Sequence, residues 1–279
     1  MKKVLYLADA YKIDRHPLEF AGFVCQLLHA PLTGLFVELA AHDSASEKAL
    51  REEMICSGGD CNRDTPMEVL RDECVQRNLT LFRNTCDEIG FNAHALLISD
   101  HIADTVVTEC RYADLLLIDP ALGLSVSNAG HSPSMARNIL AQSECPVILV
   151  PERFDGLEEI VFAYDGSPSS VFAIKQFCTL FPRLTDRKLT VLTARGETWV
   201  SKNELQLMGD WLRGNFREVK FVNAGDDSKI ALLEYVLEKD KLLIVMGAYG
   251  RSGWSTFVTS SHAEPLAKFV SKALFISHH

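Results

Sequence analysis

Two halves of this 279-residue chain carry the same succession of short apolar runs and amphipathic segments. In each half the first run ends in an aspartate, and these residues, Asp9 and Asp165, lie 156 positions apart. A second set of matches has a constant spacing of 127 positions, namely Leu115–Ile118 with Leu242–Val245, Gly123 with Gly250, and Ser134 with Ser261. We assign the difference between the two spacings to an insertion at about residues 39–66. Self-similarity of this kind indicates an internal duplication.

Each half is predicted to alternate strands with helices. In the first half we expect strands at Lys3–Ala8, Pro31–Glu38, His94–Ser99, Leu115–Ile118 and Pro146–Val150, with helices at about Arg15–His29, Met67–Ile89, Ile102–Tyr112 and Ser134–Ala141. In the second half we expect strands at Glu159–Tyr164, Leu189–Ala194, Val219–Val222, Leu242–Met246 and Ala273–Ser277, with helices from Pro168, over Ser201–Arg213, over Ser228–Glu238 and up to Ser271. This order implies parallel strands with helices on both faces. The predicted fold is α/β, with two tandem open parallel five-stranded sheets, in residues 1–152 and 157–279.

Composition places the chain among ordinary globular proteins. Its hydrophobic content is 47% and its charged content is 23%, and no apolar run reaches the roughly 20 residues that cross a bilayer. The N-terminal segment lacks the apolar core and cleavage site of a secretory signal, so we expect a cytoplasmic protein. Residues 1–150 carry the whole net charge of −9. Because neither half has a cluster of Lys and Arg, we expect no nucleic-acid partner.

The eight cysteines all lie between Cys25 and Cys178. In a chain of this size without a secretory signal, we expect reduced thiols rather than disulfides. Cys56 and Cys61 form the one local pair with metal or redox potential, but their spacing is wider than Cys-x-x-Cys and no second pair stands at a zinc-binding spacing. We therefore expect no metal site, and the role of the insertion that contains this pair stays open.

The stretch from Leu242 to Ser261 is the strongest candidate for a binding site. Its unbroken apolar run is typical of a strand buried on both faces. The residues that follow are glycines at three-residue spacing and then a serine pair before a helical pattern, namely Gly247, Gly250, Gly253, Ser260 and Ser261. Glycine lets the backbone approach a phosphate, and the N–H groups at a helix start point toward it. The alternative is that the glycines only turn the chain between strand and helix.

With both repeats in view, the chain resembles the universal stress protein family in its tandem, two-domain form, whose fold is of the adenine-nucleotide alpha-hydrolase type. The segment Ala163–Ser170, AYDGSPSS, is similar to the family's first-strand signature, in which an aspartate closes the strand and small residues open the helix. The late stretch resembles the family's nucleotide-binding pattern of glycine, two residues, glycine, nine residues, glycine, and then serine or threonine. Gly247, Gly250 and Ser261 match this pattern, whereas Ser260 stands where the third glycine is usual.

The resemblance implies a site for ATP or a related adenine nucleotide, with or without Mg²⁺, in the second half. Asp165 would contact the adenine and Ala194 would line it. The phosphates would lie against the glycine loop and the following helix start, formed by Gly247, Gly250, Arg251, Ser260, Ser261 and the backbone of His262. Two points stay open. Asp165 can serve as the N-cap of the helix at Pro168, either in place of the adenine contact or together with it. Ser260 costs about 1 kcal/mol if it must adopt a positive φ.

The first half departs from this pattern. The spacing of 127 residues aligns Pro120 with Gly247 and Pro133 with Ser260. Proline has no N–H to donate to a phosphate and does not adopt a positive φ. We therefore expect the first half to bind no nucleotide. The resemblance implies that it pairs with the second half as a pseudo-dimer, because the family's dimers often use the last strand, here Val147–Val150 and Leu274–Ser277.

Three hypotheses on function follow. The first is a cytoplasmic universal stress protein that binds a nucleotide and acts as a stress-response regulatory or survival factor. The second is a scaffold that binds no nucleotide and acts through protein partners, which the serine at position 260 favours. The third is an enzyme such as an ATP pyrophosphatase-type ligase or an electron-transfer flavoprotein subunit, but no SGG-type loop follows either first strand. No nucleophile–base pair or paired carboxylates are recognisable, so we expect no catalytic residues and at most slow hydrolysis of bound ATP. The stress signal, the partner and homodimer formation stay open.

Overall fold

The computed structural model describes most of both halves of the chain. The described residues are 2–39, 48, 50–52, 65–122, 135–193, 201–223, 234–248 and 272–277. No helix among them is long and apolar enough to cross a membrane.

The elements follow the predicted order in both halves. The first half contains β1 (Val4–Asp9), α1 (Arg15–Leu28), β2 (Leu32–Val37), α3 (Met67–Ile89), β3 (Ala93–Ile98), α4 (Ile102–Cys110), β4 (Leu115–Ile118), α5 (Met135–Gln142) and β5 (Val147–Leu149). The second half contains β6 (Glu159–Tyr164), α6 (Pro168–Leu180), β7 (Lys188–Thr193), α7 (Lys202–Arg213), β8 (Val219–Asn223), β9 (Leu242–Gly247) and β10 (Ala273–Ser277). Their ends lie within two residues of the predicted ends. The predicted helices at Ser228–Glu238 and before Ser271 lie partly or wholly outside the described residues.

Local signals explain where these helices begin and end. Helix α3 ends at Gly90, which has φ 89° and donates its backbone N–H to the carbonyl of Cys86 at 3.0 Å. Helix α7 begins with a capping box, because the Ser201 hydroxyl accepts from the backbone N–H of Glu204 while the Glu204 carboxylate accepts from the backbone N–H of Ser201. Each device pairs backbone groups that a helix end leaves unsatisfied.

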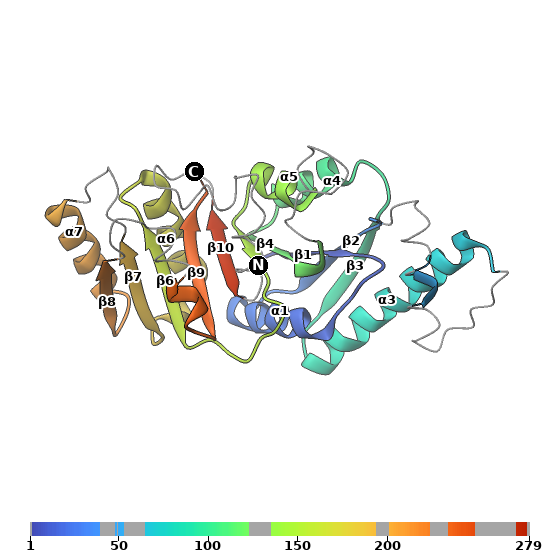
Figure 1. Ribbon diagram of the computed structural model, residues 1–279, viewed down its shortest axis with the longest axis horizontal. Coiled ribbons are helices and arrows are strands. Elements are labelled where there is room, and N and C mark those ends of the chain that lie inside the picture. Colours follow the sequence, from blue (N-terminus) through green and yellow to red (C-terminus); the bar gives the residue numbers. More distant parts are fainter. Residues whose placement is uncertain are drawn as a thin grey trace.

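The strands form one sheet in the order β3-β2-β1-β4-β5-β10-β9-β6-β7-β8. Within each half the five strands are parallel and have the same order, whereas β5 pairs with β10 in an antiparallel manner, with Phe275 opposite Ile148. The predicted α/β fold with parallel strands is confirmed. In place of two separate sheets, the two five-stranded units form a continuous ten-stranded sheet (Figure 1).

Helices cover both faces of the sheet, as predicted. In β1, Val4 and Tyr6 face the core under α1 and α3, whereas Leu5 and Leu7 face the core under α4 and α5. These two pairs of helices lie below and above the first half of the sheet in Figure 1. The second half places α6 and α7 on the same face as α1 and α3. Alternate residues of each strand therefore belong to two separate cores.

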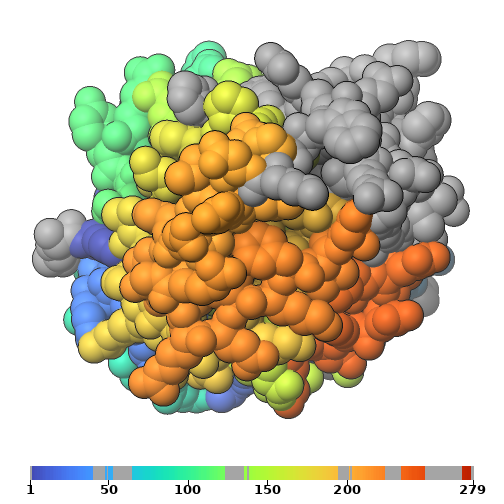
Figure 2. Space-filling view, turned by 90° about the vertical axis from the view of Figure 1, so that its left-hand side faces the viewer, coloured from blue at the N-terminus to red at the C-terminus, as the bar shows by residue number. Residues whose placement is uncertain are grey.

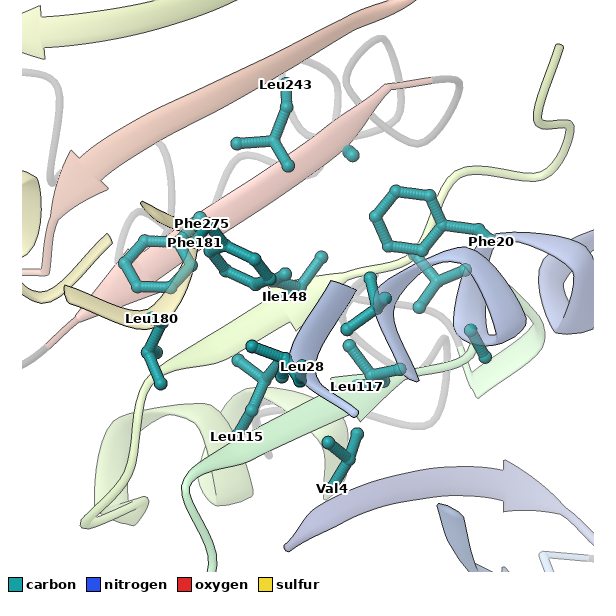
Figure 3. Packing of buried hydrophobic residues seen from close by; sticks show 14 of the residues in the cluster. Val4, Phe20, Leu28, Leu115, Leu117, Ile148, Leu180, Phe181, Leu243 and Phe275 are labelled. Atoms are coloured by element: carbon teal, nitrogen blue, oxygen red, sulfur yellow. The ribbon is translucent and has the colours of Figure 1, made fainter. Parts of the chain in front are cut away.

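The core under α1 and α6 runs without a break from one half to the other. Leu28 of α1, Ile148 of β5 and Phe275 of β10 belong to one cluster, and Phe181 follows α6 into it (Figure 3). Phe275 and Phe181 have ring centroids 6.3 Å apart at an interplanar angle of 80°. Edge-to-face contacts of this kind are favourable between buried rings. The antiparallel strand pair is thus supported by side-chain packing across the two halves.

The segment between the halves is anchored to the first half by an aromatic side chain. Phe154 lies against Phe20 and Phe23 of α1, with ring centroids 5.2 Å and 4.9 Å away. The Lys2 ammonium also donates to the carbonyl of Leu180, at the end of α6, at 3.1 Å. The position at which one domain ends and the next begins stays a prediction.

The structure corrects the sequence match between β4 and β9 by one residue. Val4 pairs with Leu115 in the first half, and Ile160, its equivalent when Asp9 is matched with Asp165, pairs with Leu243. Leu115 and Leu243 also face the same core. The match of Leu115 with Leu242 is therefore wrong. Every residue of β4 and every residue of β9 before Gly247 is apolar, so no alternation fixed their register in the sequence.

Candidate functional site

Two of the predicted site residues lie beside each other at one edge of the sheet. Asp165 directly follows β6, and Gly247 is the last residue of β9. These strands are parallel neighbours, with Phe162 opposite Val245, so both residues stand at their carboxyl ends. From β6 the chain proceeds to β7 on one side, while β9 is followed by β10 on the other. Open α/β sheets bind ligands at such a reversal of strand order. The other predicted site residues lie outside the described residues, namely Ala194, Gly250, Arg251, Ser260, Ser261 and His262.

Asp165 shapes the turn between β6 and α6. Its side chain is buried, and Oδ1 accepts a hydrogen bond from the backbone N–H of Ser167 at 2.9 Å. Gly166, between them, has φ 73°, which glycine adopts without strain. The N-cap of α6 is Ser167, whose hydroxyl accepts from the backbone N–H of Ser170 at 3.1 Å. The alternative that Asp165 is the N-cap is therefore wrong.

Gly247 allows the first turn of α6 to lie directly against the end of β9. A Cβ atom at this position would stand 2.6 Å from the carbonyl carbon of Ser169 and 2.7 Å from its oxygen. Such distances leave no space for any side chain. Glycine at 247 thus brings a helix N-terminus, which carries a partial positive charge, to the same edge as Asp165.

Three serines of this helix start were not predicted to belong to the site. Ser167, Ser169 and Ser170 are all buried at the edge formed by β6 and β9. The Ser170 hydroxyl donates to the carbonyl of Ser167 at 2.8 Å. Their signal in the sequence is the run SPSS, which by itself indicates only a helix start. Their burial shows that the start of α6 packs closely against the sheet.

The matching edge of the first half has a different chemistry. With the corrected register, the residue equivalent to Gly247 is Asp119 rather than Pro120. Asp119 is buried, accepts a hydrogen bond from the hydroxyl of Tyr6, and accepts another at Oδ1 from the backbone N–H of Ala121 at 2.7 Å. Burial raises the pKa of this carboxyl to about 6. A carboxylate therefore occupies the place that a glycine holds in the second half.

Asp9 shares its turn geometry with Asp165. Its Oδ1 accepts from the backbone N–H of Tyr11, two residues later, at 2.9 Å, as Asp165 accepts from Ser167 at 2.9 Å. The phenol of Tyr11 donates to Glu38 at 3.1 Å. The two halves thus conserve the aspartate turn and differ at the end of the neighbouring strand.

The described cysteines are free thiols. Cys25, Cys74, Cys86, Cys110 and Cys145 are buried and Cys178 is half-buried. Burial raises the pKa of Cys25 and of Cys178 to about 12, which favours the unreactive thiol. Within the part of the chain that the structure describes, no group of three His, Cys, Asp or Glu side chains could hold a metal ion. Cys56 and Cys61 lie outside it.

A buried charged cluster lies at the opposite edge of the second half. Glu159, the first residue of β6, accepts from Thr190 at 2.6 Å, from Tyr235 at 2.6 Å and from the ammonium of Lys239 at 2.8 Å. Burial alone would raise the pKa of Glu159, but these donors outweigh it and hold the pKa at about 2. Because the cluster lies at the amino ends of the strands, it supports the fold and is remote from the candidate site.

Comparisons with known proteins identify the fold. No family model and no curated protein matches the chain. A universal stress protein from Archaeoglobus fulgidus DSM 4304 superimposes with a TM-score of 0.65 and 12% identity over 99% of this chain and 96% of that one. A protein named as a putative universal stress protein from Pseudomonas aeruginosa UCBPP-PA14 superimposes with a TM-score of 0.57 and 12% identity, over 100% of this chain and 93% of that one. Along its whole length, therefore, this chain has the fold of the universal stress proteins.

Proposed function

We propose that the chain is a tandem universal stress protein whose second half binds ATP or a related adenine nucleotide. The observation that carries the proposal is the placement of Asp165 and Gly247 on neighbouring strand ends, with the N-terminus of α6 packed against them. A carboxylate can accept a hydrogen bond from the adenine amino group, and a helix N-terminus favours an anion nearby. The same edge thus offers groups suited to both ends of a nucleotide.

The remaining contacts of the proposal come from the glycine loop. Ala194 would line the adenine, while the backbone N–H groups and hydroxyls of the loop would hold the phosphates, with the positive charge of Arg251 beside them. The loop residues are Gly250, Ser260, Ser261 and His262. Mg²⁺ bound with the nucleotide would offset the charge of the phosphates. We assign no catalytic residue, and propose a cytoplasmic role in stress-response regulation or survival.

The first half is proposed to bind no nucleotide. Asp119 places a carboxylate where Gly247 stands in the second half, and the next residue, Pro120, has no N–H to donate. An ionised carboxylate beside a phosphate would repel it. This half would serve to pair with the second half through β5 and β10.

A thermal-shift titration with ATP and Mg²⁺ tests this function. A ligand that binds only the native state raises its stability by about 2.7 kcal/mol at a concentration of 100 times Kd. We expect a saturable rise for the wild type and for Asp9→Ala, and a much smaller rise for Asp165→Ala. The two variants lose the same kind of turn contact, at 2.9 Å in each case, so Asp9→Ala controls for damage to the turn.

The competing function is a scaffold that acts through protein partners. If millimolar ATP shifts the melting temperature of neither the wild type nor Asp9→Ala, the nucleotide proposal is wrong and this function replaces it. If Asp9→Ala loses the shift while Asp165→Ala keeps it, the nucleotide binds in the first half, and the assignment of the two halves is reversed.

A further inference from the structure

A cleft lies between α6 and α7, and one end of it borders the candidate nucleotide site, because Tyr164 and Gly166, on either side of Asp165, also line it. Its volume is about 590 Å³, within the range of about 300–1,000 Å³ that small-molecule sites occupy. One wall is formed by the face of α6 that carries Val171 and Lys175, and the other by the face of α7 that carries Leu207, Met208 and Trp211. On each helix the lining residues recur at intervals of three and four, so each wall is a continuous stripe along the helix.

The two halves differ in the packing of this pair of helices. In the first half the equivalent helices, α1 and α3, pack together. A Cβ atom on Gly22 of α1 would stand 2.8 Å from Ile89, the last residue of α3, and 2.8 Å from Phe91, which follows the helix. In the second half, α7 keeps two large apolar side chains exposed beside the cleft, Leu207 at 62% and Trp211 at 40%. Exposed apolar surface that borders a cavity marks a place where an apolar ligand can bind. Figure 2 shows the face formed by α7 and β8, in orange.

The two ends of the cleft differ in charge. Glu204 lies near the starts of the two helices. Its carboxylate accepts a hydrogen bond from the backbone N–H of Ser201 at 2.8 Å. Lys175 lies seven residues beyond Pro168, and so about 10 Å along α6. It forms no ion pair with any residue that the structure describes. A ligand with one anionic end is therefore favoured at Lys175 and disfavoured at Glu204.

We propose that this cleft binds a free medium-chain fatty acid, with its alkyl chain between the two stripes and its carboxylate at Lys175. The apolar walls match an unbranched alkyl chain, since aliphatic and aromatic side chains face it from both helices. The unpaired lysine matches a single negative charge at one end. This proposal does not rest on nucleotide binding, because the carboxylate would lie at Lys175, about 10 Å along α6 from the end of the cleft that borders the nucleotide edge.

Calorimetric titration of the full-length protein with octanoate and decanoate, below their micellar concentrations, tests the proposal. We expect saturable binding of one molecule per chain, with affinity rising about fourfold for each added methylene. Lys175→Gln should weaken decanoate binding about two- to fivefold, since the lysine is exposed, and should leave decanol binding unchanged. The control variant Lys12→Gln, in the first half, should change neither decanoate binding nor decanol binding.

A pair of matched variants tests the position of the alkyl chain. Leu207→Glu places a charge in the wall of the cleft. Leu237→Glu places a charge in the helical segment 234–237, which packs on the other face of the sheet, and the two side chains are similarly exposed, at 62% for Leu207 and 56% for Leu237. We expect only Leu207→Glu to abolish decanoate binding. The proposal is overturned if decanoate does not bind saturably, if both variants bind as the wild type does, or if both lose binding equally. Binding to phosphatidylglycerol vesicles without binding to free decanoate would also overturn it, in favour of a membrane surface.

Discussion

The close approach of α6 to β9 predicts that Gly247→Ala destabilises the second half. The added Cβ would stand 2.5 Å from Oγ, 2.6 Å from the carbonyl carbon and 2.7 Å from the carbonyl oxygen of Ser169. The hydroxyl can rotate away, but the carbonyl group belongs to the backbone of the helix, so the first turn of α6 must move. Overpacking of this kind costs about 1–3 kcal/mol. Because α6 also holds the turn at Asp165, we expect nucleotide affinity to fall as well.

Gly209→Ala is the matched control for this prediction. Gly209 lies inside α7, and a Cβ there would stand no closer than 3.5 Å to any neighbour. Alanine favours a helix over glycine by about 1 kcal/mol, so this variant should be as stable as the wild type or more stable. Urea denaturation followed by circular dichroism measures both midpoints.

A double variant distinguishes the side-chain clash from the backbone clash. Because two of the three short distances involve the Ser169 carbonyl group, Ser169→Gly combined with Gly247→Ala should not restore the wild-type midpoint. Equal midpoints for the wild type and Gly247→Ala would refute the reasoning. Full rescue by Ser169→Gly would show that only the hydroxyl is in the way.

Three further predictions concern stability. Glu159→Gln should cost about 2 kcal/mol at neutral pH, since Lys239 loses its partner, and the loss should shrink as the pH falls from 4.5 toward 2, where wild-type Glu159 takes up its own proton. Asp119 has the opposite pH dependence, because burial raises its pKa from 3.8 to about 6. As the pH falls from 6 to 3.8, the free energy of unfolding of the wild type should rise by up to about 3 kcal/mol relative to that of Asp119→Asn. Denaturation midpoints measured as a function of pH check the predictions for Glu159 and for Asp119. Phe154→Ala should cost about 2 kcal/mol by removing the anchor on α1 and should speed proteolysis of the linker, which mass spectrometry of the fragments would show.

The succession of elements could be predicted because its causes are local. The helix Met67–Ile89 has the same bounds in the sequence analysis and in the structure, because its apolar spacing and the following Gly90 both stand in the sequence. The short buried strands were equally clear, since each is an unbroken apolar run between polar residues. The fold class followed from the order of these elements alone.

The register of those same strands could not be predicted. Every residue of β4 and all but the last of β9 are apolar, and all are buried, so a shift by one residue leaves the pattern unchanged. The consequence was the assignment of Pro120, rather than Asp119, to the place of Gly247. Only the pairing with β1 and β6 fixes the match.

The candidate site was predicted in part. The aspartate turn and the glycine at the end of β9 were both recognised, and the structure places them on neighbouring strands. The contact of Gly247 with Ser169 joins residues far apart in the chain, and so do the bonds of Asp119 with Tyr6 and of Glu159 with Lys239. No local sequence pattern predicts such contacts, because they depend on which strands become neighbours in the sheet.

The number of nucleotides bound per chain tests the central claim most directly. Isothermal titration of the full-length protein with ATP and Mg²⁺ should give one saturable site, and Gly250→Val, which adds a branched side chain to the proposed phosphate loop, should abolish it. A stoichiometry of one that is lost in this variant is the predicted result. A stoichiometry of two would show that the first half also binds, despite Asp119, and a stoichiometry of zero would contradict nucleotide binding altogether.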